Sequence, residues 1–492
     1  MMEAEQKEKT PISSDLQAVK GYMEKNVGLG VSFDLGVREI LIRDTNIQIY
    51  YVNGLCDTNY IIEIMQSLAD INEFKDIDKN EPDVYELVHN RIVDQSVVVV
   101  QTMDEMVDQV LSGLISIIVA GSEKALIVDV RSYPGRQPQE PDTERITRGA
   151  RDGYVENIII NTALTRRRIR DERLRFEIMR VGERSKTDIA IGYIEGIANP
   201  KLVDIVRSEL QSIEIDGLTM AEKTVEEYIV NQGYNPYPLV RYTERADVGA
   251  NHLLEGHVLI YVDTSPSIMI TPTTFFHHVQ HAEEYRQSAS VGTLIRWFRF
   301  LGILASLFIL PLWLLFVLEP HLLPESMKFI GPQDDAHVHI LLQIAVAEVG
   351  IELLRIAAIH TPAPLSSAMG LIAAVLIGQI AIDVGWMVPE VLLYVAVASI
   401  GSFTTPSLEL GLANKYMRYL ILILTALFHV QGYMMANALL IIFLTRINTL
   451  STPYLWPFIP FAPKALLNII IRRPVPGRHL RPRILHPVDR TK

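Results

Sequence analysis

The chain has 492 residues, of which 49% are hydrophobic and 21% charged, and its formal net charge is −12. Up to residue 290 it carries 47 acidic and 30 basic residues, whereas the remainder carries 10 acidic and 15 basic residues and most of the long apolar runs. This composition excludes an intrinsically disordered chain, and the acidic first part argues against a general nucleic-acid binder. It predicts a soluble module followed by a membrane module.

The first residues are charged and lack the apolar core of a signal peptide, so we expect the soluble module to stay in the cytoplasm. Residues 1–30 are interpreted as a polar lead-in. The single cysteine, Cys56, is then expected to be reduced, and it permits neither an intrachain disulfide nor a cysteine-based metal site.

Short apolar segments that alternate with charged helical ones predict a cytoplasmic α/β domain of two subdomains, at residues 31–140 and 150–290. In the first we expect strands at residues 47–52 and 97–101, and a hairpin at 114–130 that turns at Ala120–Glu123. A loop at 133–141, rich in Pro, Arg and Gln, indicates the boundary. In the second we expect helices at 155–172 and 200–211, strands at 176–181 and 188–195, and a hairpin at 258–271.

No catalytic signature is present: the chain lacks a Gly-x-x-x-x-Gly-Lys-Ser/Thr loop, a Gly-x-Ser-x-Gly elbow and a His-Glu-x-x-His pair. We therefore expect neither an enzyme nor a cofactor. His277 and His281, spaced to share one helical face, are weak zinc candidates. A solvated or membrane-facing histidine cluster is the favoured alternative.

A run of arginines invites comparison with nucleic-acid binders. Acidic residues are interleaved with it, which favours salt-bridged helix faces or subunit contacts over nucleic acid as a partner. The arginines are Arg166, Arg167, Arg168, Arg170, Arg173 and Arg175.

An α-helical multi-pass membrane domain is predicted at residues 296–450, followed by a Pro-rich, basic, cytoplasmic tail at 451–492. Arg296 and Arg299 precede the first apolar stretch, and Lys415 and Arg418 are interpreted as another cytoplasmic turn. Two cytoplasmic ends require an even number of crossings, yet five stretches are apparent. Either one stretch is re-entrant, or the Pro-rich segment from Pro453 contributes a passage. The stretches are residues 300–318, 340–359, 368–384, 388–403 and 419–444.

Four ionisable residues within these stretches must face protein or water, because each would cost about 2.5–3.5 kcal/mol in lipid. Glu348, Glu352 and Arg355 fall on one helical face, and Glu352 is placed to pair with Arg355. The favoured interpretation is a buried ion-pair network that locks helix packing. The fourth residue is Asp383.

Ile372, Leu376, Gln379 and Asp383 form a second stripe, which suits a narrow pore with an acidic mouth. Apolar rings close such a pore by dewetting, and a ring of carboxylates favours cations. The alternative is a helix–helix contact, because Gly370 and Gly378 also permit close packing.

Several strings resemble those of the A-subunit family of spore germinant receptors, and the resemblance runs from about residue 45 to 463. The most specific is Tyr193-Ile-Glu-Gly-Ile-Ala-Asn-Pro. The others are Arg184-Ser-Lys-Thr-Asp-Ile-Ala-Ile, Tyr242-Thr-Glu-Arg, Leu253-Leu-Glu-Gly, Pro272-Thr-Thr-Phe, Glu352-Leu-Leu-Arg, Ser402-Phe-Thr-Thr-Pro and Pro453-Tyr-Leu. His277–His281 depart from the aromatic and polar residues expected at that place.

The resemblance implies a protein of the bacterial spore inner membrane whose soluble domain faces the core. It further implies a homo-oligomer, a pentamer, around a central pore for monovalent cations, which promotes or amplifies germination. A second small multi-pass membrane protein is the implied partner. The rival hypothesis is a non-conducting scaffold that holds other germination proteins together.

Overall fold

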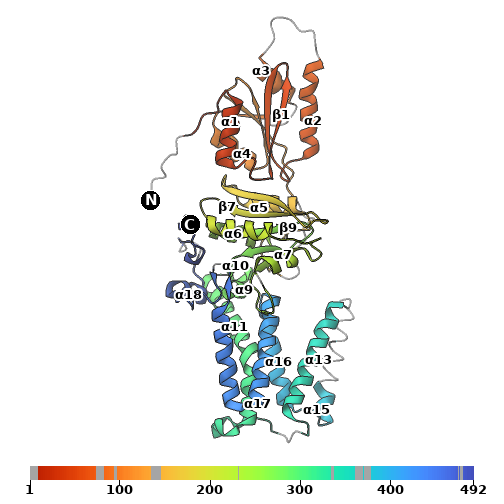
Figure 1. Cartoon of the computed structure of the whole chain (residues 1–492), viewed down its shortest axis with the longest axis vertical. Coiled ribbons are helices and arrows are strands. Elements are labelled where there is room, and N and C mark those ends of the chain that lie inside the picture. The colour runs from red at the N-terminus through yellow and green to blue at the C-terminus, as the bar shows by residue number, and fades with distance from the viewer. Residues whose placement is uncertain are drawn as a thin grey trace. The chain divides into compact units, whose positions relative to one another are not determined.

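The computed structural model describes residues 9–73, 83–92, 97–134, 144, 146–230, 232–333, 337–360, 370, 378–450, 452–474, 476 and 480–491. The chain divides into two compact units (Figure 1). The α/β unit comprises Met1–Gln232, Val240–Pro272 and Pro476–Lys492, and the helical unit comprises Gly233–Leu239 and Thr273–Val475.

The α/β unit contains two five-stranded antiparallel sheets. The first has the order β1-β2-β4-β5-β3 and the second the order β6-β7-β9-β10-β8. The strands of the first sheet are β1 (Leu35–Ile42), β2 (Thr45–Val52), β3 (Val97–Val100), β4 (Ile115–Val119) and β5 (Ala125–Val128). Those of the second are β6 (Leu174–Val181), β7 (Thr187–Ile194), β8 (Arg241–Thr243), β9 (Val258–Val262) and β10 (Ile268–Thr271).

Helices cover both faces of each sheet, which agrees with the continuous burial of the central strands β4 and β9. The helices of the first sheet are α1 (Leu16–Tyr22), continued by a π-helical turn at Met23–Val27, then α2 (Thr58–Ala69), α3 (Val84–Arg91) and α4 (Met103–Leu111). Those of the second are α5 (Ile158–Arg168), α6 (Pro200–Gln211), α7 (Ala221–Ile229) and α8 (Ala246–Glu255).

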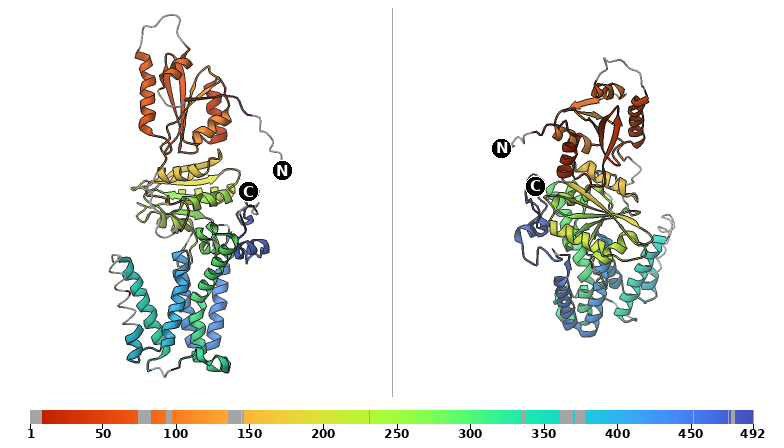
Figure 2. Two further views of the ribbon diagram at one scale, coloured as in Figure 1. Left: turned by 180° about the vertical axis from the view of Figure 1, so that it is seen from behind. Right: turned by 45° about the horizontal axis from the view of Figure 1, so that its top comes forward.

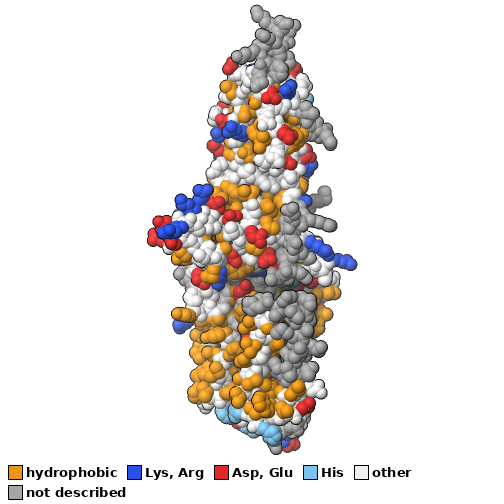
Figure 3. Space-filling view, turned by 90° about the vertical axis from the view of Figure 1, so that its right-hand side faces the viewer, with side chains coloured by type: hydrophobic (Ala, Val, Ile, Leu, Met, Phe, Trp, Pro, Cys, Tyr) orange, Lys and Arg blue, Asp and Glu red, His pale blue; other side chains and the backbone are white. Residues whose placement is uncertain are grey.

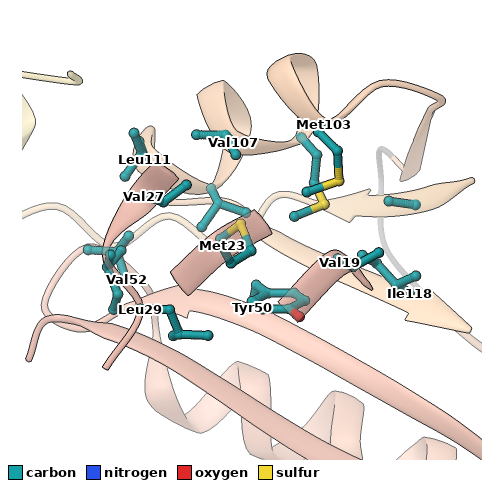
Figure 4. Packing of buried hydrophobic residues seen from close by; sticks show 14 of the residues in the cluster. Val19, Met23, Val27, Leu29, Tyr50, Val52, Met103, Val107, Leu111 and Ile118 are labelled. Atoms are coloured by element: carbon teal, nitrogen blue, oxygen red, sulfur yellow. The ribbon is translucent and has the colours of Figure 1, made fainter. Parts of the chain in front are cut away.

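The core between α1, α4 and the first sheet is apolar (Figure 4). Val19 and Met23 lie over Tyr50 of β2, beside Met103 and Val107 of α4. Residues 16–27, which the sequence presents as part of a polar lead-in, therefore belong to this core. A second cluster, which includes Ile47 and Ile64, fills the opposite face under α2 and α3.

The two sheets are built on one plan. Each follows the order helix, strand, strand, helix, helix, strand, helix, strand, strand, and equivalent residues lie 142 or 143 positions apart over most of its length. Ile47 pairs with Val119 in the first sheet, and the equivalent Ile189 pairs with Val262 in the second. We call residues 11–128 the first repeat and residues 153–271 the second repeat.

Short-range signals agree between the repeats as well. Asp57 caps α2 and the equivalent Asn199 caps α6, each by accepting hydrogen bonds from backbone N–H groups of the first turn. Gly54 and Gly196 follow β2 and β7 with φ of 80° and 78°, a conformation that favours glycine. The structure thus contains a tandem duplication that we did not predict.

The predicted strands and hairpins of the α/β unit are confirmed by β2, β3, β4–β5, β6, β7 and β9–β10. The helix predicted at 200–211 is confirmed as α6. The helix expected at 155–172 is shorter, because the Asn157 side chain caps α5 and the backbone is extended again at Ile169.

The helical unit is largely apolar on its outside (Figure 3). Two helices of the described chain are long and apolar enough to cross a membrane: Ala289–Leu318, which comprises α11 (Ala289–Leu304), a π-helical segment (Ala305–Ile309) and α12 (Leu310–Leu318), and α17 (Leu408–Arg446). The remaining helices are α9 (Phe275–Val279), α10 (Ala282–Arg286), α13 (Ile340–His360), α15 (Ala381–Asp383), α16 (Pro389–Phe403) and α18 (Pro463–Ile470), with 3-10 turns at Pro320–Leu322 and Glu325–Ile330.

Helix α17 is two arms that meet at His429, whose φ of 52° and ψ of −128° are not helical. The Tyr237 hydroxyl lies 3.4 Å from Asn414 near the start of α17, and its ring lies 6.2 Å from Phe443 near the end. A straight helix would separate Asn414 and Phe443 by about 43 Å. The chain therefore doubles back, and the interpretation of residues 419–444 as one stretch is wrong.

Candidate functional site: charged groups among the apolar helices

A buried ion pair joins α13 to the first arm of α17. Arg418 Nη2 lies 2.8 Å from Glu348 Oε1 and donates to Oε2 at 2.9 Å, and the Tyr419 hydroxyl donates to the same Oε2 at 3.1 Å. Glu348 and Arg418 are 2% and 0% exposed, so the pair is shielded from solvent within a single chain.

Arg418 also contacts the apolar helix Ala289–Leu318. Its Nη1 donates at 2.7 Å to the backbone carbonyl of Ser306, in the π-helical segment before α12. With the five-residue spacing of a π-helix, the partner of that carbonyl would be Pro311, which has no N–H. The carbonyl is thus available to the guanidinium, and three segments meet at Arg418.

A second ion pair lies one helical turn further along α13. Glu352 accepts a hydrogen bond from Lys415 Nζ of α17. It also accepts two hydrogen bonds from Arg355, one from Nη2 and one, at 3.0 Å, from Nε. Two carboxylates and three cations therefore form one network. Removing Glu348 would leave the buried Arg418 without its carboxylate, which costs about 3–5 kcal/mol in a buried pair.

The structure thus brings Glu352 and Arg355 together and gives Glu348 a different partner. Lys415 and Arg418 themselves lie within the first three turns of α17, after the connection at residues 404–407, and pair with α13. Sequence reasoning missed these two cations and Tyr419 as members of the site. Their three-residue spacing in an apolar helix, beside the four-residue spacing of the two glutamates, was the available signal.

The second predicted stripe is described only in part. Ile372 and Leu376 lie outside the described residues. Gln379 lies in a π-helical turn, Asp383 is the last residue of α15, and both side chains are exposed in the single chain. Water or a neighbouring molecule must therefore meet the Asp383 carboxylate.

The two histidines proposed as weak zinc candidates do not share a helical face. Helix α9 ends at Val279, the backbone of Gln280 is extended, and His281 is the N-cap that precedes α10. His277 Nδ1 accepts from Thr274 N at 2.9 Å, and His281 Nδ1 accepts from Glu283 N at 3.2 Å. Each imidazole therefore serves a helix start. Among the described residues, no group of three or more His, Cys, Asp or Glu side chains is placed to hold a metal ion.

The arginine run forms ion pairs within the α/β unit, and one of its partners, Asp171, is among the acidic residues interleaved with it. Arg166 pairs with Asp34 at 2.8 Å, and both side chains are buried. Arg168, Arg173 and Arg175 pair with Asp152, Asp171 and Glu195. Arg167 lies over the ring of Tyr133 at 4.4 Å.

The chain was compared with known families and proteins. The model of the family described as "Bacillus/Clostridium GerA spore germination protein" matches residues 22–484. Stage V sporulation protein AF of Bacillus subtilis is 62% identical over 96% of this chain and 95% of that protein. Spore germination protein KA of Bacillus subtilis is 27% identical over 99% and 90% of the respective chains, and spore germination protein GerLA of Bacillus cereus is 28% identical over 94% of each.

Among solved structures, the crystal structure of the N-terminal domain of the A subunit of the Bacillus megaterium spore germinant receptor GerK3 is 30% identical. It covers 55% of this chain and 99% of that chain, with a TM-score of 0.43. The family predicted from the sequence strings is confirmed by the match over residues 22–484. The chain therefore belongs to the GerA spore germination protein family of Bacillus and Clostridium.

Proposed function

We propose that this chain is a subunit of a homo-oligomeric, pentameric channel for monovalent cations in the spore inner membrane. Family membership makes the chain a spore germination or sporulation membrane protein, and the descriptions of the family and its relatives are not those of enzymes. The observation that carries the finer proposal is Asp383, an exposed carboxylate that lies with the exposed Gln379 at one end of the stripe.

The division of α17 at His429 supports a topology with both ends of the chain on one side. The apolar segments then number six: Ala289–Leu318, α13, residues 368–384, α16 and the two arms of α17. The arms, residues 408–428 and 430–446, are about 31 and 25 Å long, close to the thickness of a hydrocarbon core. Six crossings place the α/β unit and the basic tail together, on the cytoplasmic, core-facing side.

In this proposal the charged network is the fixed frame and the stripe of Asp383 is the conducting surface. Ile372 and Leu376 line a constriction that closes by dewetting, and Gln379 and Asp383 face its mouth. The Glu348–Arg418 and Glu352–Lys415 pairs hold α13 against α17, so that movement of the α/β units repositions the helices as a group. A second small multi-pass membrane protein completes the assembly.

Cation flux in liposomes that contain the full-length protein, with its partner, tests this proposal. Asp383→Asn is expected to reduce the flux of monovalent cations or their selectivity over anions, because the mouth loses a negative charge in every subunit. Glu325→Gln is the matched control, since Glu325 is 94% exposed in a 3-10 turn and is expected to leave conduction unchanged. Equal effects of the two changes, or no effect of either, would contradict the role of Asp383.

The rival function is a non-conducting scaffold, which the Glu348–Arg418 network favours because it fixes helix packing without any pore. Leu376→Lys separates the two functions. A charge in the constriction of a channel hydrates it and produces a constant leak, whereas a charge in the packing of a scaffold only lowers thermal stability. Spores that carry the variant are expected to germinate prematurely if the chain conducts.

A further inference from the structure

Helix α18, which follows the last apolar segment, is held by hydrogen bonds to the middle of α11. Arg296 Nη1 donates to the backbone carbonyls of Asn468 at 3.0 Å and Ile469 at 2.7 Å, and Trp297 Nε1 donates to that of Ile470 at 3.1 Å. These are carbonyls of the last turn of α18, which have no partner within their own helix. Arg296 is itself held by the buried Glu284 at 2.7 Å.

The anchored helix crosses α11 instead of running along it (Figures 1 and 2). The backbone N–H of Arg472, just beyond α18, donates to the Thr293 hydroxyl at 3.1 Å, which fixes the end of the segment as well. An eight-residue helix held in this way has a defined rotation about its own axis. Each of its faces therefore has a definite environment.

Side-chain burial divides α18 into three faces. Ile469 is 8% exposed and packs against the helical unit. Leu467 and Ile470, three residues apart and so on one side, are 44% and 38% exposed. Lys464 and Asn468, four residues apart, are also exposed and form a polar face. A helix with separate protein-facing, apolar and polar faces is typical of one that lies at a membrane surface.

The apolar face of α18 continues onto the exposed apolar side of α11. Trp297, Phe298 and Leu301 of α11 are 52%, 63% and 63% exposed. Tryptophan is the side chain that membrane proteins concentrate at the level of the lipid headgroups. Because Trp297 donates a hydrogen bond to α18, the exposed apolar surfaces of α11 and α18 lie next to each other, at what would be the same level of a membrane.

The residues around α18 carry a net positive charge, which favours one class of lipid surface over another. No aspartate or glutamate occurs between Glu409 and Asp489, a span that includes the whole of α18. Lys464 in the first turn of α18 and Arg473, three residues beyond its end, are both exposed. Basic residues beside an interfacial helix attract anionic lipid headgroups.

We infer that α18 is an interfacial helix that binds the anionic phospholipid surface of the leaflet adjoining the start of α11. Its apolar face inserts at the boundary between headgroups and acyl chains, and Lys464 and Arg473 meet the phosphate groups. This inference rests on the proposed membrane embedding of α11. It gives the basic tail a lipid-binding role that is separate from conduction.

Site-specific fluorescence in reconstituted vesicles tests the inference. In a Cys56→Ser background, Leu467→Cys, Asn468→Cys and Leu301→Cys are labelled singly with an environment-sensitive dye in the full-length protein. Quenching by nitroxide-bearing lipid reports contact of the dye with acyl chains, and quenching by aqueous iodide reports contact of the dye with water. Leu467 is the test site, its neighbour Asn468 is the matched control on the polar face, and Leu301 reports whether α11 is in lipid.

Nitroxide lipid is expected to quench the dye at Leu467 about threefold more than the dye at Asn468. Iodide is expected to quench the dye at Asn468 more than the dye at Leu467. Replacing part of the phosphatidylcholine with phosphatidylglycerol is expected to increase lipid quenching at Leu467, and Lys464→Gln with Arg473→Gln is expected to abolish that increase.

Iodide quenching of Leu467 equal to that of Asn468, with Leu301 quenched by lipid, would place α18 in water and overturn the inference. Shielding of Leu467 from both quenchers would mean that protein, such as a second copy of the chain, covers the face, and would overturn it too. Equal lipid quenching with and without phosphatidylglycerol would overturn the selection of anionic lipid. Absence of lipid quenching at Leu301 would instead contradict the embedding of α11, and with it the proposed function.

Discussion

The two repeats of the α/β unit share a fold but fill its centre differently. In the second repeat, the Thr165 hydroxyl lies 2.8 Å from the Tyr154 hydroxyl and 2.9 Å from that of Tyr261. The equivalent positions of the first repeat, 142 or 143 residues earlier, hold Ile12, Met23 and Ile118, all buried in an apolar core. The comparison shows that strand order and register require burial at these positions and not a particular chemistry.

The repeats also differ in how their edges are protected. In the second repeat, Arg245 beyond β8 donates to the carbonyls of Glu144 and Ala150 at 3.2 and 2.9 Å, so the segment before that repeat covers the edge strand. In the first repeat, Val98 and Val99 of the edge strand β3 are 49% and 42% exposed. The polar interior and the covered edge make the second repeat the more specialised of the two.

The largest expected effect concerns the contact between the repeats. Asp34 of the first repeat accepts from Arg166 Nε of the second at 2.8 Å, and both side chains are buried. Asp34→Asn leaves the guanidinium without a counter-charge and is expected to cost about 3–5 kcal/mol of the free energy of unfolding. Hydrogen exchange of the strands in the full-length protein measures this loss.

Asp171→Asn is the control for this prediction. Asp171 forms a pair with Arg173 that is partly exposed, so its loss is expected to cost less than about 1 kcal/mol. Similar losses from the two variants would show that the buried pair does not hold the repeats together.

Two equivalent glycines offer a sharper comparison. Alanine at either Gly54 or Gly196 is strained by the positive φ, which costs about 1–2 kcal/mol. At Gly54 the new methyl group would also meet the Ala163 side chain of the second repeat at 2.9 Å, whereas at Gly196 the nearest atom is Arg173 Nη1 at 3.7 Å. Gly54→Ala is therefore expected to lower the melting temperature clearly more than Gly196→Ala, and the reverse order would contradict the packing of the repeats.

The pH dependence that arises from buried histidines is expected in the second repeat. Burial, assisted by the positive charge of Arg241, lowers the pKa of His252 to about 3 and that of His257 to about 4, from an ordinary value of 6.5. Below pH 6.5 the unfolded histidines take up protons that the folded ones refuse, so stability is full above that pH and falls as the pH drops towards 4. At pH 5 the loss is about 2 kcal/mol for each histidine.

The equivalent positions of the first repeat hold Gln109 and Leu114, which do not titrate. Hydrogen exchange at pH 7 and pH 5 is expected to show faster opening in the second repeat, and His252→Gln with His257→Leu is expected to remove the difference. Equal acceleration in both repeats would assign the effect to other groups.

Local patterns predicted most strands of the α/β unit, because alternating apolar residues and turn residues act over a few positions. The duplication was not predicted because few residues are identical between the two repeats. The clearest is Thr-x-Ile-x-Ile-x-Tyr-x-x-Gly, which begins at Thr45 and again at Thr187. The register of strand pairing shows the duplication directly, because register depends on which residues are buried more than on which residues are identical between the repeats.

The candidate site was harder to predict, because its ion pairs join residues far apart in the chain. Glu352 and Arg355 are neighbours on one helix and could be paired from their spacing, but Lys415 and Arg418 lie more than 60 positions away from the carboxylates that they contact. The reversal at His429 was missed because the residue at the turn is neither proline nor glycine, and Gly432, whose missing side chain lets the second arm pass Leu424 of the first, was not recognised as its signal.

The central claim, that the helical unit conducts cations, is tested most directly by current through a planar bilayer that contains the full-length oligomer and its partner. Under a gradient of potassium chloride, we expect a reversal potential close to that of potassium, shifted towards zero by Asp383→Asn and unchanged by Glu325→Gln. A current with the reversal potential of chloride, or no current from an intact oligomer, would contradict the account.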